Sequence, residues 1–129
     1  MRRLPLWTVA AMLLVLAGCQ KLSLEKEANL GAEGKQWVIE GPQSEQKLTV
    51  KVTADEPVNA FIVLQEDAAA GENGLRSRQK PSKALAGVED ETELEFEVTV
   101  PAKKDFVVCV GPGKKAKKFP HAKVTVKSK

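Results

Sequence analysis

Two thiols and one imidazole are the side chains best suited to nucleophilic chemistry in this 129-residue chain: Cys19, Cys109 and His121. Cys109 lies in the apolar run Phe106–Val110, which is typical of a buried strand, where a free thiol behaves as a small hydrophobe. A nucleophilic Cys109 would need a base, and His121 is the only histidine. The sequence also lacks G-x-S-x-G, H-E-x-x-H and a Gly-rich phosphate loop. We therefore predict no catalytic residue, no metal ligand and no cofactor.

The segment before Cys19 has the three parts of a secretory signal. Arg2 and Arg3 form a cationic start, and an apolar run follows from Leu4 to Leu16. This run is shorter than the about 20 residues that a membrane-spanning helix needs. Ala17 and Gly18 are small enough for a signal peptidase. Residues 1–18 are thus predicted to be a signal peptide.

Leu16-Ala17-Gly18-Cys19 resembles the lipobox of bacterial lipoproteins at all four positions. The resemblance implies a diacylglycerol on the Cys19 thiol, cleavage after Gly18, and often an acyl chain such as palmitate on the new amino group. Two chains give stable anchoring at about 0.8 kcal/mol per buried methylene. An Asp directly after the lipobox cysteine would resemble an inner-membrane retention signal. This chain has Gln20 at that position, which favours the outer membrane in a host with two membranes. An ordinary signal peptide, in which Cys19 has no role, is the alternative.

The charge of the chain is divided unevenly along its length. Residues 20–100 carry nine Lys or Arg against sixteen Asp or Glu, whereas residues 101–129 carry nine Lys and one Asp. The two parts are expected to complement each other across one domain. This balance and the exported address argue against nucleic acid as a partner.

Period-two alternation predicts an all-β domain over residues 36–129, after a lipidated Cys19 and a flexible tether over residues 19–35. The clearest strand is Thr92–Val100, where four apolar side chains face inward and Glu93, Glu95 and Glu97 face outward. Six strands are predicted in all: 36–40, 47–53, 58–64, 92–100, 106–110 and 122–127. Residues 55–57 are interpreted as a turn, no convincing amphipathic helix is found, and Trp37 is expected to cover the core.

Two features refine this β architecture. The gap at residues 66–91 is longer than most loops of compact domains, so it is expected to hold hidden structure or function, and residues 84–88 could supply a seventh strand. The acids of this region could suggest calcium, but alternation spreads them along a solvated face: Glu89, Asp90, Glu91, Glu93, Glu95 and Glu97. The outward side chains among them are Glu93, Glu95 and Glu97. They suit a neighbouring strand that presents Lys47 and Lys51, or Lys123 and Lys127. An antiparallel β-sandwich is the main prediction and a small barrel the alternative.

The end of the chain resembles bacterial pre-peptidase-type β-sandwich modules over about residues 46–128. The resemblance rests on an alternating strand, the Val100-Pro101-Ala102-Lys103-Lys104 turn, the strand at 106–110 and a Val-x-Val end at Val124 and Val126. It implies a secreted accessory or binding module without catalytic residues. Small envelope lipoproteins without known activity are similar to an equal degree.

Two clusters of cations are the candidate binding residues. The first is Arg76, Arg78, Lys80 and Lys83 in the 66–91 gap. The second is Lys114, Lys115, Lys117 and Lys118, between Gly113 and an exposed Phe119. Such a loop could contact anionic headgroups or anionic glycans, or it could only solubilise the domain. Lys103 and Lys104 are expected to join the same end of the sandwich.

The sequence thus predicts a membrane-anchored, non-enzymatic envelope lipoprotein that is a structural or binding module of unknown ligand. Its expected partners are the membrane, through lipid on Cys19, and an envelope protein or anionic polymer. A small enzyme or transport accessory subunit that uses the 66–91 loop is the alternative. Convergence of Arg76, Arg78 and Lys80 with Lys114–Lys118 around a concave site would favour specific binding, whereas scatter over a convex surface would favour a structural module.

Overall fold

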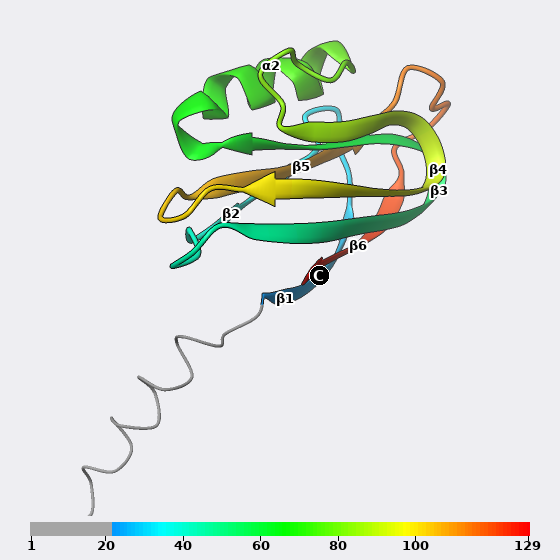
Figure 1. Cartoon of the computed structure of the whole chain (residues 1–129). Coiled ribbons are helices and arrows are strands. Elements are labelled where there is room, and N and C mark those ends of the chain that lie inside the picture. Colours follow the sequence, from blue (N-terminus) through cyan, green and yellow to red (C-terminus); the bar gives the residue numbers. More distant parts are fainter. Residues whose placement is uncertain (1–21) are drawn as a thin grey trace, which may run out of the picture.

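A computed structural model describes residues 22–129, and Gly18 and Cys19 lie outside the described residues. Six strands form one antiparallel sheet, in which β1, β6, β3, β5 and β2 are consecutive neighbours and β4 pairs with β3 (Figure 1). The strands are β1 (Ser23–Asn29), β2 (Lys35–Ile39), β3 (Gln46–Leu64), β4 (Ala86–Val100), β5 (Phe106–Pro112) and β6 (His121–Ser128). The predicted all-β class is confirmed.

The sheet folds over on itself because β3 and β4 are long and bend together (Figure 1). The first half of β3, residues 48–54, pairs with β6. The second half, residues 58–64, pairs with β5. The pairing of β3 with β4 shifts register between Thr53 and Val58 and again between Val58 and Ala60, which are the irregularities that bend strands. The result is a β-sandwich whose two layers share β3 and β4.

The main core lies between these layers and uses alternate residues of each strand. Val50 and Val52 of the first layer are fully buried, as are Ile62 and Val108 of the second. Leu94, Val98 and Val100 are buried and Phe96 is half-buried, so the predicted inward face of this strand is confirmed. Trp37 is half-buried against the same core, as expected for a residue that covers it.

A second, smaller core lies on the outer face of the β3–β5 layer, beneath the helix α2 (Ala68–Ser77). Phe61 and Val63 of β3 and Val107 and Cys109 of β5 point to this face and pack with Leu75 of the helix. The second half of β3 and all of β5 are therefore apolar on both sides, since one side fills the sandwich and the other supports α2. A short 3-10 turn, η1 (Gln65–Asp67), leads from β3 into the helix.

Two glycines explain both the packing of α2 and why its sequence does not resemble a helix. Each glycine weakens a helix by about 1 kcal/mol relative to alanine. A Cβ at Gly71 would lie 3.1 Å from Cys109 Sγ, and one at Gly74 would lie 3.2 Å from Phe61 Cζ. The helix can thus approach the sheet closely because these positions lack side chains. The prediction of no helix is wrong for this reason, although hidden structure in the 66–91 gap is confirmed.

The prediction of a flexible tether over residues 19–35 is wrong from Ser23 onward. Residues 23–29 are β1, which pairs along its whole length with β6. Leu30 is 1% exposed within the main core, and its N–H donates to the carbonyl of Pro120 at 2.7 Å. The polar composition of β1 misled the prediction, because β1 is an edge strand with an exposed outer face. The β domain therefore begins before residue 36.

The interpretation of residues 55–57 as a turn between two strands is also wrong. Asp55, Glu56 and Pro57 lie inside β3, at the bend that carries it from one layer to the other. Proline within a strand is typical of a bulge, where the ladder is interrupted. Likewise, the possible seventh strand at 84–88 is the start of β4, which runs on from Ala86 to Val100.

Candidate functional site

The basic loop, defined here as residues 113–119, joins β5 to β6 at the bend of β3 and β4. Its four lysines are exposed, and Phe119 is 60% exposed. Pro120, which follows, is buried. Among residues 22–129, no ion pair joins the ammonium groups of Lys114, Lys115, Lys117 or Lys118 to a carboxylate.

Carboxylates of the bent strands hold the backbone of this loop. Asp90 Oδ1 accepts from the Lys115 N–H at 2.9 Å, and Glu56 Oε1 accepts from the Lys117 N–H at 2.7 Å. Asp55 Oδ1 accepts from the N–H of His121 at 2.8 Å. Hydrogen bonds that involve an ionised group are stronger than neutral ones. The acids thus fix the main chain, while the lysine side chains extend from it.

Arg78 links the helix to the basic loop. It ends α2 in the left-handed conformation, with φ of 56°, and its N–H donates to the carbonyls of Gly74 and Leu75. Its guanidinium donates from Nη1 to the carbonyl of Gly113 at 3.2 Å. One cation of the first predicted cluster is therefore adjacent to the second cluster.

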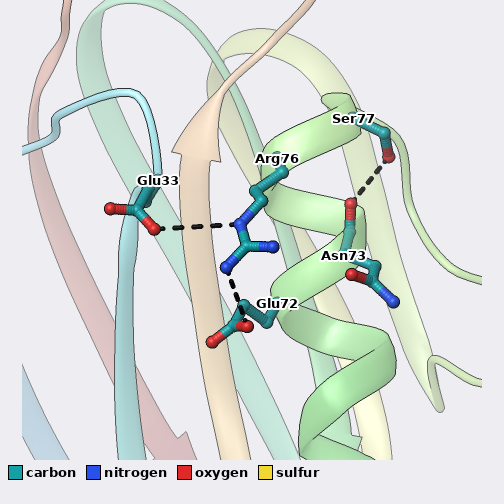
Figure 2. Close-up of polar contacts among 5 residues, drawn as sticks. All are labelled: Glu33, Glu72, Asn73, Arg76 and Ser77. Atoms are coloured by element: carbon teal, nitrogen blue, oxygen red, sulfur yellow. Dashed lines mark hydrogen bonds and ion pairs between the residues drawn. The ribbon is translucent and has the colours of Figure 1, made fainter.

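The other three residues of the first cluster make their recorded contacts elsewhere, Arg76 and Lys83 through their side chains and Lys80 through its main chain. Figure 2 shows Arg76 between Glu72, at 3.0 Å, and Glu33, at 3.8 Å. Lys83 pairs with Asp67 at 3.5 Å, near the start of α2. The main-chain N–H of Lys80 donates to Glu89 at 2.6 Å. Of the four residues, only Arg78 has a recorded contact with the basic loop.

The expectation that Lys103 and Lys104 join the same end is wrong. They precede β5, whereas the basic loop follows it, so the seven residues of β5 separate them. At about 3.3 Å per residue, this strand spans about 20 Å. Lys104 pairs with Glu66 at 3.0 Å at the opposite end of the sandwich.

The described chain enters the sandwich at the end opposite the basic loop. Ser23, the first residue of β1, lies beside Lys127, whereas Asn29, the last, lies beside His121 at the start of β6. Figure 1 shows the basic loop, in orange, at the far end of the sandwich from the start of β1. We call the two ends the entry end and the bend end.

The outer face of the β1–β6–β3–β4 layer carries charges that alternate between strands. Lys51 of β3 lies directly opposite Glu95 of β4, which confirms the predicted neighbour for the glutamates. Lys123 of β6 pairs with Glu25 of β1 at 3.3 Å. Lys129 hydrogen-bonds Glu97, and this bond, with the nearby Lys129 charge, lowers the pKa of that carboxyl. Lys51, Lys123 and Lys129 thus have an acidic side chain beside them on this face, whereas within the described residues no ion pair is recorded for the ammonium groups of the basic loop.

Cys109 and His121 are not positioned as a catalytic pair. Cys109 is fully buried beneath α2, and burial raises the pKa of its thiol to about 11. His121 is exposed at the bend end, where its Nδ1 lies 2.7 Å from Asn29 Oδ1 and its Nε2 lies 3.4 Å from Glu27. The thiolate is the nucleophilic form, so the described geometry leaves this thiol unreactive.

Sequence reasoning missed the residues that support the basic loop. The sequence predicts a turn at Asp55 and Glu56 and a solvated face at Asp90, yet each accepts a main-chain N–H from the segment 115–121. Asn59, 1% exposed, accepts on its Oδ1 a hydrogen bond from the N–H of Asp90 at 2.8 Å. The one available signal was an isolated asparagine within an apolar strand, because a buried amide needs hydrogen-bond partners.

No protein-family model and no curated sequence matches the chain. The fold is similar to solved structures. One is PliG, a periplasmic inhibitor of g-type lysozyme from Aeromonas hydrophila, with 13% identity, a TM-score of 0.53 and coverage of 84% of this chain and 86% of that one. Another is the pre-peptidase C-terminal domain of a Bacillus anthracis collagenase, with 9% identity, a TM-score of 0.53 and coverage of 82% and 88%. These similarities confirm the β-sandwich and the fold-level resemblance to pre-peptidase modules.

Two kinds of feature are absent from the described residues 22–129. These residues hold no group of three or more His, Cys, Asp or Glu side chains placed to bind a metal ion. None of their helices has the length and apolarity needed to cross a membrane.

Proposed function

We propose that this protein is a non-enzymatic binding module of the bacterial envelope, anchored by lipid on Cys19. Its binding surface is the bend end, where the basic loop and Arg78 lie. The observation that carries the proposal is the construction of this loop: two carboxylates hold its main chain, a third holds the start of β6 directly after it, and four lysines extend from it. A loop that served only solubility would not need this support.

The position of the loop supports the anchored arrangement. Only residues 20–22 separate Cys19 from β1, and three extended residues span at most about 10 Å. A chain anchored at Cys19 would therefore hold the entry end of the sandwich close to the lipid surface. The bend end would then face away from that surface, towards other envelope components. The similarity to a periplasmic lysozyme inhibitor supports an envelope location and a function by binding.

Membrane fractionation with fatty-acid labelling tests the anchor. The wild-type protein is expected in the membrane fraction with incorporated label, and Cys19→Ala is expected to lose both. Unchanged membrane association of Cys19→Ala without label in the wild-type protein would contradict a lipid anchor.

Site-specific photo-crosslinking in cells tests the binding surface. A crosslinking side chain in place of Lys118, at the bend end, is expected to capture an envelope component. The same side chain in place of Lys103, at the opposite end, is the matched control. Equal capture at both positions, or capture at neither, would contradict a binding role for the bend end.

A further inference from the structure

We propose that the ligand of the basic loop is a linear anionic glycan, a polysaccharide that carries carboxylate or phosphate groups along its length. This inference rests on the proposed binding function of the bend end and names its partner class. Three observations carry it. They are the unpaired lysines on a main chain that is held in place, the exposed aromatic ring beside them, and the position of both relative to the entry end.

The first observation is that the main chain that carries the cations is held in place before binding. Hydrogen bonds hold the loop main chain at Gly113, Lys115 and Lys117, so the lysine side chains extend from a fixed backbone. Gly113 donates its N–H to the carbonyl of Pro57 at 3.0 Å and accepts from Arg78. Binding a charged polymer therefore orders only lysine side chains, which lowers the entropic cost. Repeated anionic groups match cations spaced along one loop.

The second observation is the ring of Phe119. It is 60% exposed next to the last lysines, and the buried Pro120 after it fixes the chain. An exposed aromatic face can pack against the C–H face of a sugar ring, which a purely ionic ligand does not offer. A cation beside an aromatic ring thus suits a sugar that carries an acid group.

The third observation disfavours two other partners. An anionic lipid surface would meet the entry end first, because β1 places the basic loop about 20 Å away from it. A stable protein interface buries about 800 Å² per partner around an apolar centre. Phe119 is the one exposed large apolar side chain of this loop, because the other two among residues 22–129 are Val38 on β2 and Leu85 before β4. The loop therefore lacks the apolar centre of a stable protein interface.

Binding assays on the full chain in non-ionic detergent micelles test the inference. The probes are polygalacturonate, neutral dextran, polyglutamate and vesicles of anionic phospholipid. Wild-type protein is expected to bind polygalacturonate, less tightly as salt increases, and not dextran. The double variant Lys117→Gln/Lys118→Gln should lose about 25-fold in affinity, if each cation contributes about fivefold. The matched double variant Lys103→Gln/Lys127→Gln removes two cations away from the loop and should bind like wild type.

Phe119→Ala separates a glycan from other polyanions. It should weaken binding to polygalacturonate and leave any binding to polyglutamate unchanged, with an unaltered melting temperature. Equal loss by the two double variants would overturn the inference, as would tighter binding to vesicles or polyglutamate than to the glycan. If the glycan fails while position 118 still crosslinks an envelope protein, the partner class is wrong and the proposed binding function stands.

Discussion

Asp90 of β4 accepts a hydrogen bond on Oδ1 from the main-chain N–H of Lys115, at 2.9 Å, across 25 residues of sequence. This bond connects the bend of the sheet to the basic loop. Asp90 is itself in the left-handed conformation, with φ of 55°, and its own N–H donates to Asn59 Oδ1 at 2.8 Å. One residue therefore links the bend of β4, the buried amide of β3 and the loop with the unpaired cations.

The Asp90 bond predicts a graded series of stabilities. Asp90→Asn keeps an acceptor and tolerates φ above zero, so it should be mildest. Asp90→Gly loses the acceptor but suits the backbone, and should cost about 1 kcal/mol. Asp90→Ala loses the acceptor and retains the left-handed strain, so it should cost about 2 kcal/mol. Denaturant unfolding measures the order.

Hydrogen exchange at the Lys115 amide gives the control for this series. Protection of that amide should fall in the Ala and Gly variants and persist in Asp90→Asn. Equal protection in all three variants would show that the carboxylate does not hold the loop.

Gly113 predicts a second effect on the same region. A Cβ at this position would meet Asp90 Oδ1 well inside van der Waals contact and would lie 3.2 Å from Asn59 Oδ1. Gly113→Ala should therefore destabilise the domain by about 1–3 kcal/mol, the usual cost of overpacking. Gly31→Ala is the matched control, because nothing lies within 4 Å of its added Cβ. Similar melting temperatures for the two variants would contradict the close packing at the foot of the loop.

The opposite charges of Lys51 and Glu95 predict a loss of stability in each single charge reversal that the double exchange restores. Glu95 is on the edge strand β4, so β3 is its one strand neighbour, and Lys51 lies directly opposite. Glu95→Lys should cost about 0.2–1 kcal/mol through like-charge repulsion, and so should Lys51→Glu. The double exchange should recover most of this loss in thermal unfolding. Additive losses in the double variant would show that the two side chains do not interact.

Phe96→Asp tests the face alternation of the same strand. Phe96 pairs in register with Val50 and packs against the main core, so an aspartate there would place a charge among buried side chains. The domain should unfold or lose far more stability than in Glu95→Lys, one position away. Comparable melting temperatures for these two variants would mean that the register of β4 is wrong.

The strands and the sandwich could be predicted from alternation and apolar runs, whereas the bend that carries β3 and β4 from one layer to the other could not. The alternation around Leu94–Val100 and Leu48–Val52 identified both the strands and their inward faces. The same rule failed at Asp55–Pro57, because turn-forming residues also suit a bulge within a bent strand. It failed at β1 because edge strands are often polar.

The candidate site was predictable as a charge cluster and unpredictable as a structure. The four lysines lie within five consecutive positions, so the sequence alone shows that they form a cluster. Their support comes from Asp90 and Glu56, which are 25 and 61 positions away from the residues that they bind. Arg78 reaches Gly113 because it ends helix α2. Helix propensity does not predict α2, because the helix contains two buried glycines.

Cys109 predicts a pH-dependent stability and a protected thiol. Burial raises its pKa from 9.0 to about 11, so between these values the unfolded chain loses the thiol proton while the folded chain keeps it. Its contribution to stability is therefore fully present below pH 9.0 and is lost as the pH rises towards 11.

At pH 9.0 a thiol reagent should label Cys109 of a Cys19→Ala variant slowly in the native state and rapidly in denaturant. Rapid native labelling would contradict the burial of this side chain beneath α2, and Leu75→Ala, which opens the cover, should accelerate labelling where the exposed change Lys103→Gln does not.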